Sequence, residues 1–240
     1  MNANPDNDPS SSLFRIEVIQ VPLARPQDAR MITSARIFEG LTAPSRHADI
    51  LTAEDSARIA ARARNQPPRA PRPGPMRGGG PTQCHDITVY PSLGLAGGAC
   101  GGYGLLLDIS DVKNPIRIDA AADSNFAFWH SATFSNDGTK ILFTDEWGGG
   151  SAPRCRATDK PEWGANAIFS IVNRKLKFHS YYKIPAPQTS VENCVAHNGS
   201  LVPIPVATSW CRAGTKAEFP SSTGPTRTSR SKSPTMIAGR

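Results

Sequence analysis

Short runs in which apolar and polar residues alternate follow one another through the middle of the chain. Turn-forming sequences such as Asn136-Asp137-Gly138 and Asn114-Pro115 separate these runs. A short run with a period of two residues is typical of a β-strand that buries one face. We therefore predict nine strands in this region, at residues 85–90, 94–99, 105–109, 116–120, 130–134, 140–144, 167–171, 175–182 and 197–203.

Three of the predicted strands begin at a histidine, and similar strands and turns follow each of them. His85, His130 and His197 lie 45 and 67 residues apart, and an insertion rich in Gly, Pro and Cys at residues 148–164 lengthens the second interval. A period of about 40 to 45 residues with about four short strands is typical of a β-propeller blade. The sequence thus predicts an all-β fold, a partial β-propeller of about three antiparallel four-stranded blades, over residues 83–205.

The segments outside these blades are expected to be less regular. The sequence DSARIAARAR, at residues 55–64, could form one or two helical turns, but nothing nearby in the sequence would hold them. We expect disorder at 1–12, a strand-containing N-terminal segment at 13–40, an Arg- and Pro-rich linker or loop at 41–82, and a disordered tail at 206–240.

The tail from residue 206 onwards has no alternation and is rich in Ser, Thr and Arg. Read one base out of frame, codons compatible with it can spell a blade ending in F-D-W-T-D-P, which is close to LDISDVKNP at residues 107–115. We therefore expect this tail to be out of frame and the chain to be a non-functional fragment of a longer propeller. A natural disordered extension is the alternative.

The net charge of +7 lies in the flanking segments rather than in the blades. Residues 41–82 carry seven Arg and three acidic residues, or +4, and residues 206–240 carry six basic residues and one acidic residue, or +5. The rest of the chain is therefore 7 − 4 − 5 = −2. Nucleic-acid binding needs basic and aromatic residues interleaved on the folded part, so we expect no nucleic-acid partner.

Membrane insertion and export signals are also absent from the pattern. No run of about 18 apolar residues occurs, so we expect no membrane-spanning helix. The first residues, MNANPDNDPSSS, have neither a basic nor an apolar region of the kind that a secretory signal contains.

Four cysteines fall in the predicted blades: Cys84, Cys100, Cys155 and Cys194. None of them forms a C-x-x-C pair, which argues against a zinc ribbon or a thioredoxin-like site. Four cysteines near blade boundaries fit two disulfides in an exported protein. Three pairings are possible, one of which joins Cys84 to Cys100 and Cys155 to Cys194, and four buried thiols are the alternative.

The histidines are the candidate chemical groups. In a propeller the first strand of each blade lines the central channel, so His85, His130 and His197 would meet at one end of it. Together with Asp86, or with Asp145 and Glu146, they could bind a divalent transition metal such as Cu, Zn or Mn. Alternatively, each imidazole satisfies a backbone group at a blade junction and binds nothing, which is the usual role of a residue repeated in this way.

Other residues give weaker patterns. Ser131 follows His130, but no G-x-S-x-G motif is present, so no catalytic serine is predicted. The sequence GLAGGACGGYG, at residues 94–104, lacks the strand-to-helix context of a phosphate loop and is read as a tight loop between two strands. Trp129, Trp147 and Trp163 could form an aromatic rim or pack inside the blades.

The stretch LLLDISDVKNPIRID, at residues 105–119, resembles the repeat of the LVIVD-repeat proteins, in which an apolar strand is followed by Asp, Ser-Asp and an Asn-Pro turn. The resemblance covers residues 83–205 and extends to 13–40. It implies a bacterial β-propeller that is secreted or periplasmic, monomeric when complete, and without an assigned activity.

Two functions follow as expectations. The first is an exported binding or interaction scaffold without enzymatic activity, in which an unknown ligand or protein partner meets the channel mouth and the 148–164 insertion. The alternative is a histidine-ligated, metal-dependent enzyme, similar in outline to the copper-bearing propeller oxidases of the selenium-binding type. Only the alternative requires a cofactor, a divalent transition metal such as Cu or Zn.

Overall fold

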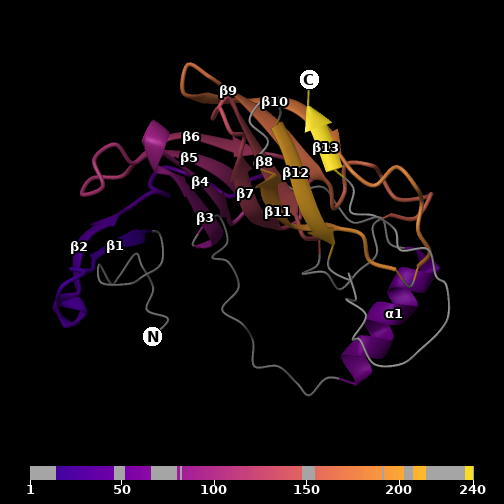
Figure 1. Cartoon of the computed structure of the whole chain (residues 1–240). Coiled ribbons are helices and arrows are strands. Elements are labelled where there is room, and N and C mark those ends of the chain that lie inside the picture. The colour runs from indigo at the N-terminus through magenta and orange to yellow at the C-terminus, as the bar shows by residue number, and fades with distance from the viewer. Residues whose placement is uncertain are drawn as a thin grey trace, which may run out of the picture.

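The computed structural model describes residues 15–45, 52–65, 80–81, 83–147, 155–190 and 192–202, and the backbone of residues 208–214 and 236–239. Antiparallel β-sheets make up most of this part of the chain (Figure 1). Every one of the nine predicted strands is confirmed, with ends that differ by at most two residues. They are β3 (Cys84–Tyr90), β4 (Leu95–Cys100), β5 (Tyr103–Asp108), β6 (Ile116–Ala122), β7 (Trp129–Phe134), β8 (Lys140–Asp145), β9 (Asn166–Val172), β10 (Lys175–Tyr182) and β11 (Ala196–Val202).

These strands form consecutive antiparallel sheets. The first sheet has the order β3-β4-β5-β6 and the second has the order β7-β8-β9-β10, so that each strand pairs with its neighbour in sequence. Tight turns make this possible. Between β9 and β10, Asn173 and Arg174 both have positive φ, at 51° and 60°, which is the conformation that a two-residue hairpin turn requires.

The first strands of successive sheets lie close together, β3 against β7 and β7 against β11. The third sheet has the order β11-β12-β13. Four-stranded antiparallel sheets are therefore confirmed for two of the three predicted blades, whereas the third sheet has three strands among the described residues. The sheets described do not close into a ring.

A continuous apolar core joins the first two sheets. Leu106 of β5 and Ile141 and Phe143 of β8 are fully buried in it, together with Trp129 of β7. Glycines of the first sheet make room for these large side chains: a Cβ on Gly104 would lie 2.6 Å from Trp129 and 2.8 Å from Phe143. The glycine-rich sequence is thus mostly strand, not loop, and its small residues admit the side chains of the next sheet.

The opposite face of the first sheet is covered by the N-terminal segment. β1 (Ile16–Gln20) and β2 (Arg30–Ala35) form an antiparallel pair, linked by a short 3-10 helix, η1 (Pro26–Asp28). Just after β2, Ile37 and Phe38 are buried against Leu105 and Leu107. Arg117 of β6 holds this segment by donating hydrogen bonds to the carbonyl oxygens of Ile37 and Glu39, at 2.6 and 2.8 Å.

Two segments expected to be irregular contain regular structure. Within 41–82, α1 (Ala53–Arg64) is a helix of 12 residues, so the expectation of a linker without stable helix was wrong there. Within 206–240, expected to be disordered, β12 (Thr208–Gly214) and β13 (Met236–Gly239) extend the third sheet from β11. Residues 1–12 and the remainder of 206–240 lie outside the described residues. The remainder of 41–82 lies partly outside them.

The helix is held by a contact that the sequence did not reveal. Thr52 caps its N-terminus reciprocally with Asp55, whose carboxylate is almost fully buried. The guanidinium of Arg156, from the segment between β8 and β9, lies 2.9 Å from Asp55 Oδ2 and 2.9 Å from Asp159 Oδ1. Burial raises the pKa of Asp55, but hydrogen bonds from Arg156 and Thr52 outweigh it and hold this pKa well below its usual range.

Candidate metal centre

The three histidines occupy the same place in their sheets. His85, His130 and His197 are each the second residue of β3, β7 and β11, the first strand of the sheet to which each belongs. The pairing register of all three strands shifts at this point, between Cys84 and Asp86, between Trp129 and Ala132, and between Ala196 and Gly199. A β-bulge bends its strand and re-aims the side chain within it. The three bulges therefore re-aim the three imidazoles, which lie together instead of following the regular alternation of side chains between the two faces of a strand.

Two of these histidines share one carboxylate. His130 Nε2 lies 3.4 Å from Glu146 Oε2, and His197 Nε2 lies 3.7 Å from Glu146 Oε1. One ligand atom from each of the three residues lies within 4.8 Å of the others. Glu146 directly follows β8, and its backbone N–H donates to the carbonyl oxygen of Phe128, which fixes it beside β7. Two imidazoles and one carboxylate are a ligand set that Zn²⁺ and related divalent ions accept.

His85 stands next to this group but is engaged differently. Its ring stacks on that of His130, with centroids 3.9 Å apart, while the rings of His130 and His197 are 4.3 Å apart. His85 Nδ1 lies 3.1 Å from the carbonyl oxygen of His130. Because a carbonyl can only accept, Nδ1 of His85 is the donor in this hydrogen bond. This contact matches the structural role that is usual for a residue repeated at equivalent positions, in which an imidazole satisfies a backbone group.

His130 is the most enclosed of the three imidazoles, and its side chain is 5 % exposed. Burial, together with the neighbouring imidazoles of His85 and His197, lowers the pKa of His130 to about 4. The carbonyl of His197 raises this pKa in turn, although among the described residues no acceptor lies in hydrogen-bond geometry at the buried Nδ1 of His130. The ring is therefore neutral at physiological pH, which is the form that binds metals.

Asp145 was predicted as a ligand beside Glu146, but the structure directs it elsewhere. Its carboxylate is fully buried and accepts hydrogen bonds from the backbone N–H groups of Ala127, Phe128 and Gly164, at 3.2, 2.9 and 2.9 Å. Burial raises the pKa of Asp145 to about 7, against these three hydrogen bonds, which lower it. Asp145 is a structural carboxylate that joins two loops, and it is not in the group that holds the imidazoles.

Ser131 has a structural role. Its hydroxyl lies 2.9 Å from that of Thr144 and donates to the carbonyl oxygen of His197 at 3.1 Å. It therefore fixes the backbone of β11 against β7.

Trp147 and Trp163 form a stacked pair beside the site rather than a rim. Their ring centroids are 4.8 Å apart, and both residues are buried with Val195 in one small apolar cluster. Trp147 follows Glu146, and Val195 precedes His197 by two residues. The cluster thus packs together the two chain segments that carry these ligands. Trp129 is separate, because it belongs to the core between the first two sheets.

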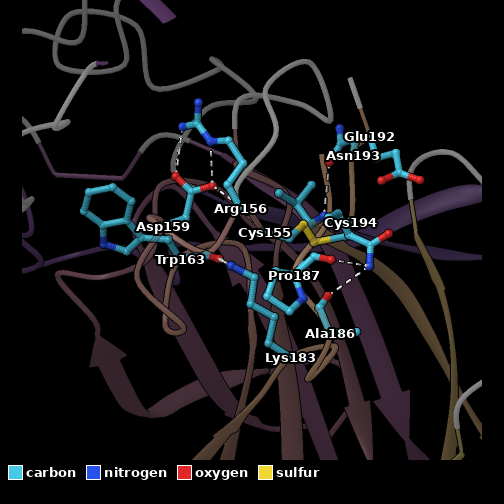
Figure 2. Close-up of a disulfide and its surroundings, with 12 residues drawn as sticks. Cys155, Arg156, Asp159, Trp163, Lys183, Ala186, Pro187, Glu192, Asn193 and Cys194 are labelled. Atoms are coloured by element: carbon cyan, nitrogen blue, oxygen red, sulfur yellow. Dashed lines mark hydrogen bonds and ion pairs between the residues drawn. A yellow bond between two sulfur atoms is a disulfide. The ribbon is translucent and has the colours of Figure 1, made fainter. Parts of the chain in front are cut away.

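The cysteines form the pairs Cys84–Cys100 and Cys155–Cys194. Figure 2 shows the second disulfide, with Arg156 and Asp159 to its left and Lys183 below it. Cys84 directly precedes His85, and Cys194 lies three residues before His197. Two disulfides are typical of a protein in an oxidising extracellular or periplasmic setting. In the residues that the structure describes, no helix is long and apolar enough to span a membrane.

Comparison with protein-family models, with curated proteins and with solved structures finds no match to this chain.

Proposed function

We propose that this protein binds a divalent transition metal through His130, Glu146 and His197, in an exported β-sheet protein of the propeller type. The observation that carries the proposal is the placement of Glu146 between two imidazoles, with both Nε2 atoms within 3.7 Å of its carboxylate oxygens. At these distances a small rearrangement of side chains would bring three donor atoms to one ion, for which the usual bond lengths are about 2.0 to 2.2 Å.

The burial of Glu146 and His130 favours a bound metal ion over a cluster of these side chains without one. The Glu146 side chain is 12 % exposed and that of His130 is 5 % exposed. A largely buried carboxylate needs a compensating positive charge, and the neutral His130 does not supply one. A divalent cation would neutralise this carboxylate and use the lone pairs of both imidazoles. The proposed ligand set contains nitrogen and oxygen atoms, which suits Zn²⁺ or Cu²⁺ better than Mg²⁺ or Ca²⁺.

His85 would support the same centre by positioning His130, without binding the metal itself. Its hydrogen bond to the backbone of His130 and its ring stacking orient the residue that is most buried. Partners of this kind usually change metal affinity by about 10- to 100-fold without being ligands. The four-stranded sheets support the propeller part of the proposal, and the three histidines at equivalent strand positions support a site at one end of the stacked first strands.

Metal stoichiometry tests the proposal. Protein freed of metal with a chelator is dialysed against Zn²⁺ or Cu²⁺, and bound metal is counted by elemental analysis. We expect about one ion per chain, and loss of that ion in His130→Ala, Glu146→Gln and His197→Ala. His179→Ala serves as the matched control, because His179 is exposed on β10 and contacts Ser180. A folded wild-type protein that retains no metal would contradict the proposal and favour the metal-free binding scaffold.

A further inference from the structure

The Cys155–Cys194 disulfide lies at the end of a short, buried path to the metal ligands. Cys194, Val195 and Ala196 are buried one after another, and His197 follows them. The backbone N–H of Ala196 donates to the carbonyl oxygen of Gly164 at 2.8 Å, and the side chain of Val195 packs directly over Gly164. The position of His197 is therefore set by the three residues that the disulfide anchors.

The same path reaches Glu146 from the other side. Val195 packs with Trp147 and Trp163, and Trp147 directly follows Glu146 in the sequence. The N–H of Gly164 donates to Asp145, which directly precedes Glu146. One small packed unit thus sets the distance between Glu146 and His197, and Cys155–Cys194 ties one of its ends to the segment that contains Cys155 and Arg156.

The loop on the Cys155 side is itself fixed. Arg156 is held by Asp159 and Asp55, and Lys183 donates to the carbonyl oxygen of Trp163 (Figure 2). By contrast, residues 184–190 and 192–193 form no helix or strand. The N–H of Gln188 donates to the carbonyl oxygen of Cys155 at 2.8 Å, and the hydroxyl of Ser190 donates to Glu54 of α1 at 3.0 Å. The disulfide is consequently the covalent tie between a fixed loop and the residues that lead into β11.

We infer that formation of the Cys155–Cys194 disulfide gates metal loading, so that the protein gains its high-affinity site only after it enters an oxidising compartment. This inference rests on the proposed metal centre. The step is a thiol–disulfide exchange with a disulfide oxidant, either a protein or a small molecule. The two thiols lose two protons and two electrons, one S–S bond forms between Cys155 and Cys194, and the S–S bond of the oxidant is reduced to two thiols.

The disulfide is buried, but a cavity borders it on the Cys155 side. Cys155 lines a cavity of about 330 Å³, together with Arg156, Tyr181, Lys183 and Pro187. In a reducing compartment the dithiol form would leave the segment before His197 without its covalent tie. Metal taken up there would be held weakly, because the spacing between Glu146 and His197 would no longer be fixed.

The test compares two double variants, each of which lacks one disulfide. Zn²⁺ affinity is measured by competition with a chromophoric chelator for the oxidised wild type, for Cys155→Ser/Cys194→Ser and for Cys84→Ser/Cys100→Ser. Serine is used because a free thiolate would be a new zinc ligand. We expect the first variant to bind Zn²⁺ about 10- to 100-fold more weakly than wild type, the range typical for groups that position ligands. The second variant should lose less, because His85 is not among the three ligands.

A further measurement covers the case in which the first variant fails to fold. The wild type is reduced at low temperature with a phosphine, its thiols are alkylated, and its affinity is measured while the far-UV circular dichroism of the β-sheets is followed. Weaker binding with unchanged dichroism supports the gate. Equal affinity in the oxidised and alkylated forms, or free thiols at all five cysteines of the purified protein, would overturn it. If the oxidised wild type binds no Zn²⁺ at all, then the proposed metal centre itself fails.

Discussion

Asp145 and Glu146 are consecutive residues whose carboxylates serve opposite purposes. Asp145 accepts three backbone N–H groups in the interior, whereas Glu146 points its two oxygens at the Nε2 atoms of His130 and His197. Side chains at the end of a strand alternate between its two faces, so adjacent residues cannot both join one site without a break in the strand. This relationship separates the structural carboxylate from the proposed ligand, and it suggests how each can be tested.

The first prediction concerns Asp145 and pH. Its pKa is about 7 in the folded protein and close to 3.8 when unfolded, so the folded state binds more protons between these values. The contribution of Asp145 to the free energy of unfolding of the metal-free protein should therefore fall as pH rises from about 4 to 7, by an amount on the order of 3 kcal/mol. Asp145→Asn cannot titrate and should remove this fall. Urea unfolding at pH 4.5 and pH 7 measures it, and parallel pH profiles for both proteins would contradict the prediction.

The second prediction concerns His130, whose pKa changes in the opposite direction. Burial lowers it to about 4 from an ordinary value of 6.5, so the unfolded state binds more protons between these values. The contribution of His130 to the free energy of unfolding is fully present above pH 6.5 and is lost as pH falls toward 4. A titration of the imidazole C2 protons by NMR, in metal-free protein, should show a midpoint near pH 4 for the resonance that disappears in His130→Gln. A midpoint above pH 6 would show that the ring is not enclosed as described.

The third prediction concerns the glycines between the first two sheets. Gly104→Ala would place a Cβ 2.6 to 2.8 Å from the rings of Trp129 and Phe143, which cannot move without disturbing the core. We expect a loss of about 1 to 3 kcal/mol in the free energy of unfolding. Gly101→Ala is the matched control, because its nearest neighbour would be Pro81 at an ordinary 3.5 Å. Thermal and urea unfolding of the two variants should differ, and equal stabilities would argue against the packing of these sheets.

The fourth prediction concerns the attachment of α1. Arg156→Met would leave the buried carboxylates of Asp55 and Asp159 without their guanidinium, at a cost of about 3 to 5 kcal/mol. We expect the helix to detach, which limited proteolysis within residues 52–65 would detect. Arg58→Met removes a partner of Asp55 that is more exposed, at 35 %, and should cost less than about 1 kcal/mol. Similar cleavage rates in the two variants would exclude the proposed role of Arg156.

The strands could be predicted because their causes are local. Alternation, glycine and Asn-Arg or Asn-Pro turns act over a few residues, and all nine predicted strands are present. The pairing of Cys84 with Cys100 was one of three possibilities, and the antiparallel pairing of β3 with β4 brings these two residues opposite each other. Helix α1 was underestimated because its main support is Arg156, which lies 101 residues from Asp55 in the chain.

The site was predicted in part. The shared position of the three histidines indicated a cluster, and the structure brings them together. The bulges that aim them have no clear sequence pattern, and the different roles of Asp145 and Glu146 depend on which face each one meets at the end of β8. The role of Asp145 is set by its partners, the N–H groups of Ala127, Phe128 and Gly164, which belong to separate loops and carry no sequence signal. The proposal that residues 206–240 are read out of frame stays a prediction, which resequencing of the locus would test.

The position of the histidines has an evolutionary consequence. Each one is the second residue of the first strand of its sheet, and those strands stand side by side. If one ancestral sheet was copied in tandem, each copy brought an imidazole to the same end of the stack without any new mutation. Glu146 alone then had to arise separately, in one of the copies. A binding site of this kind would begin as a by-product of duplication, and a single acidic substitution would turn a row of backbone supports into a set of ligands.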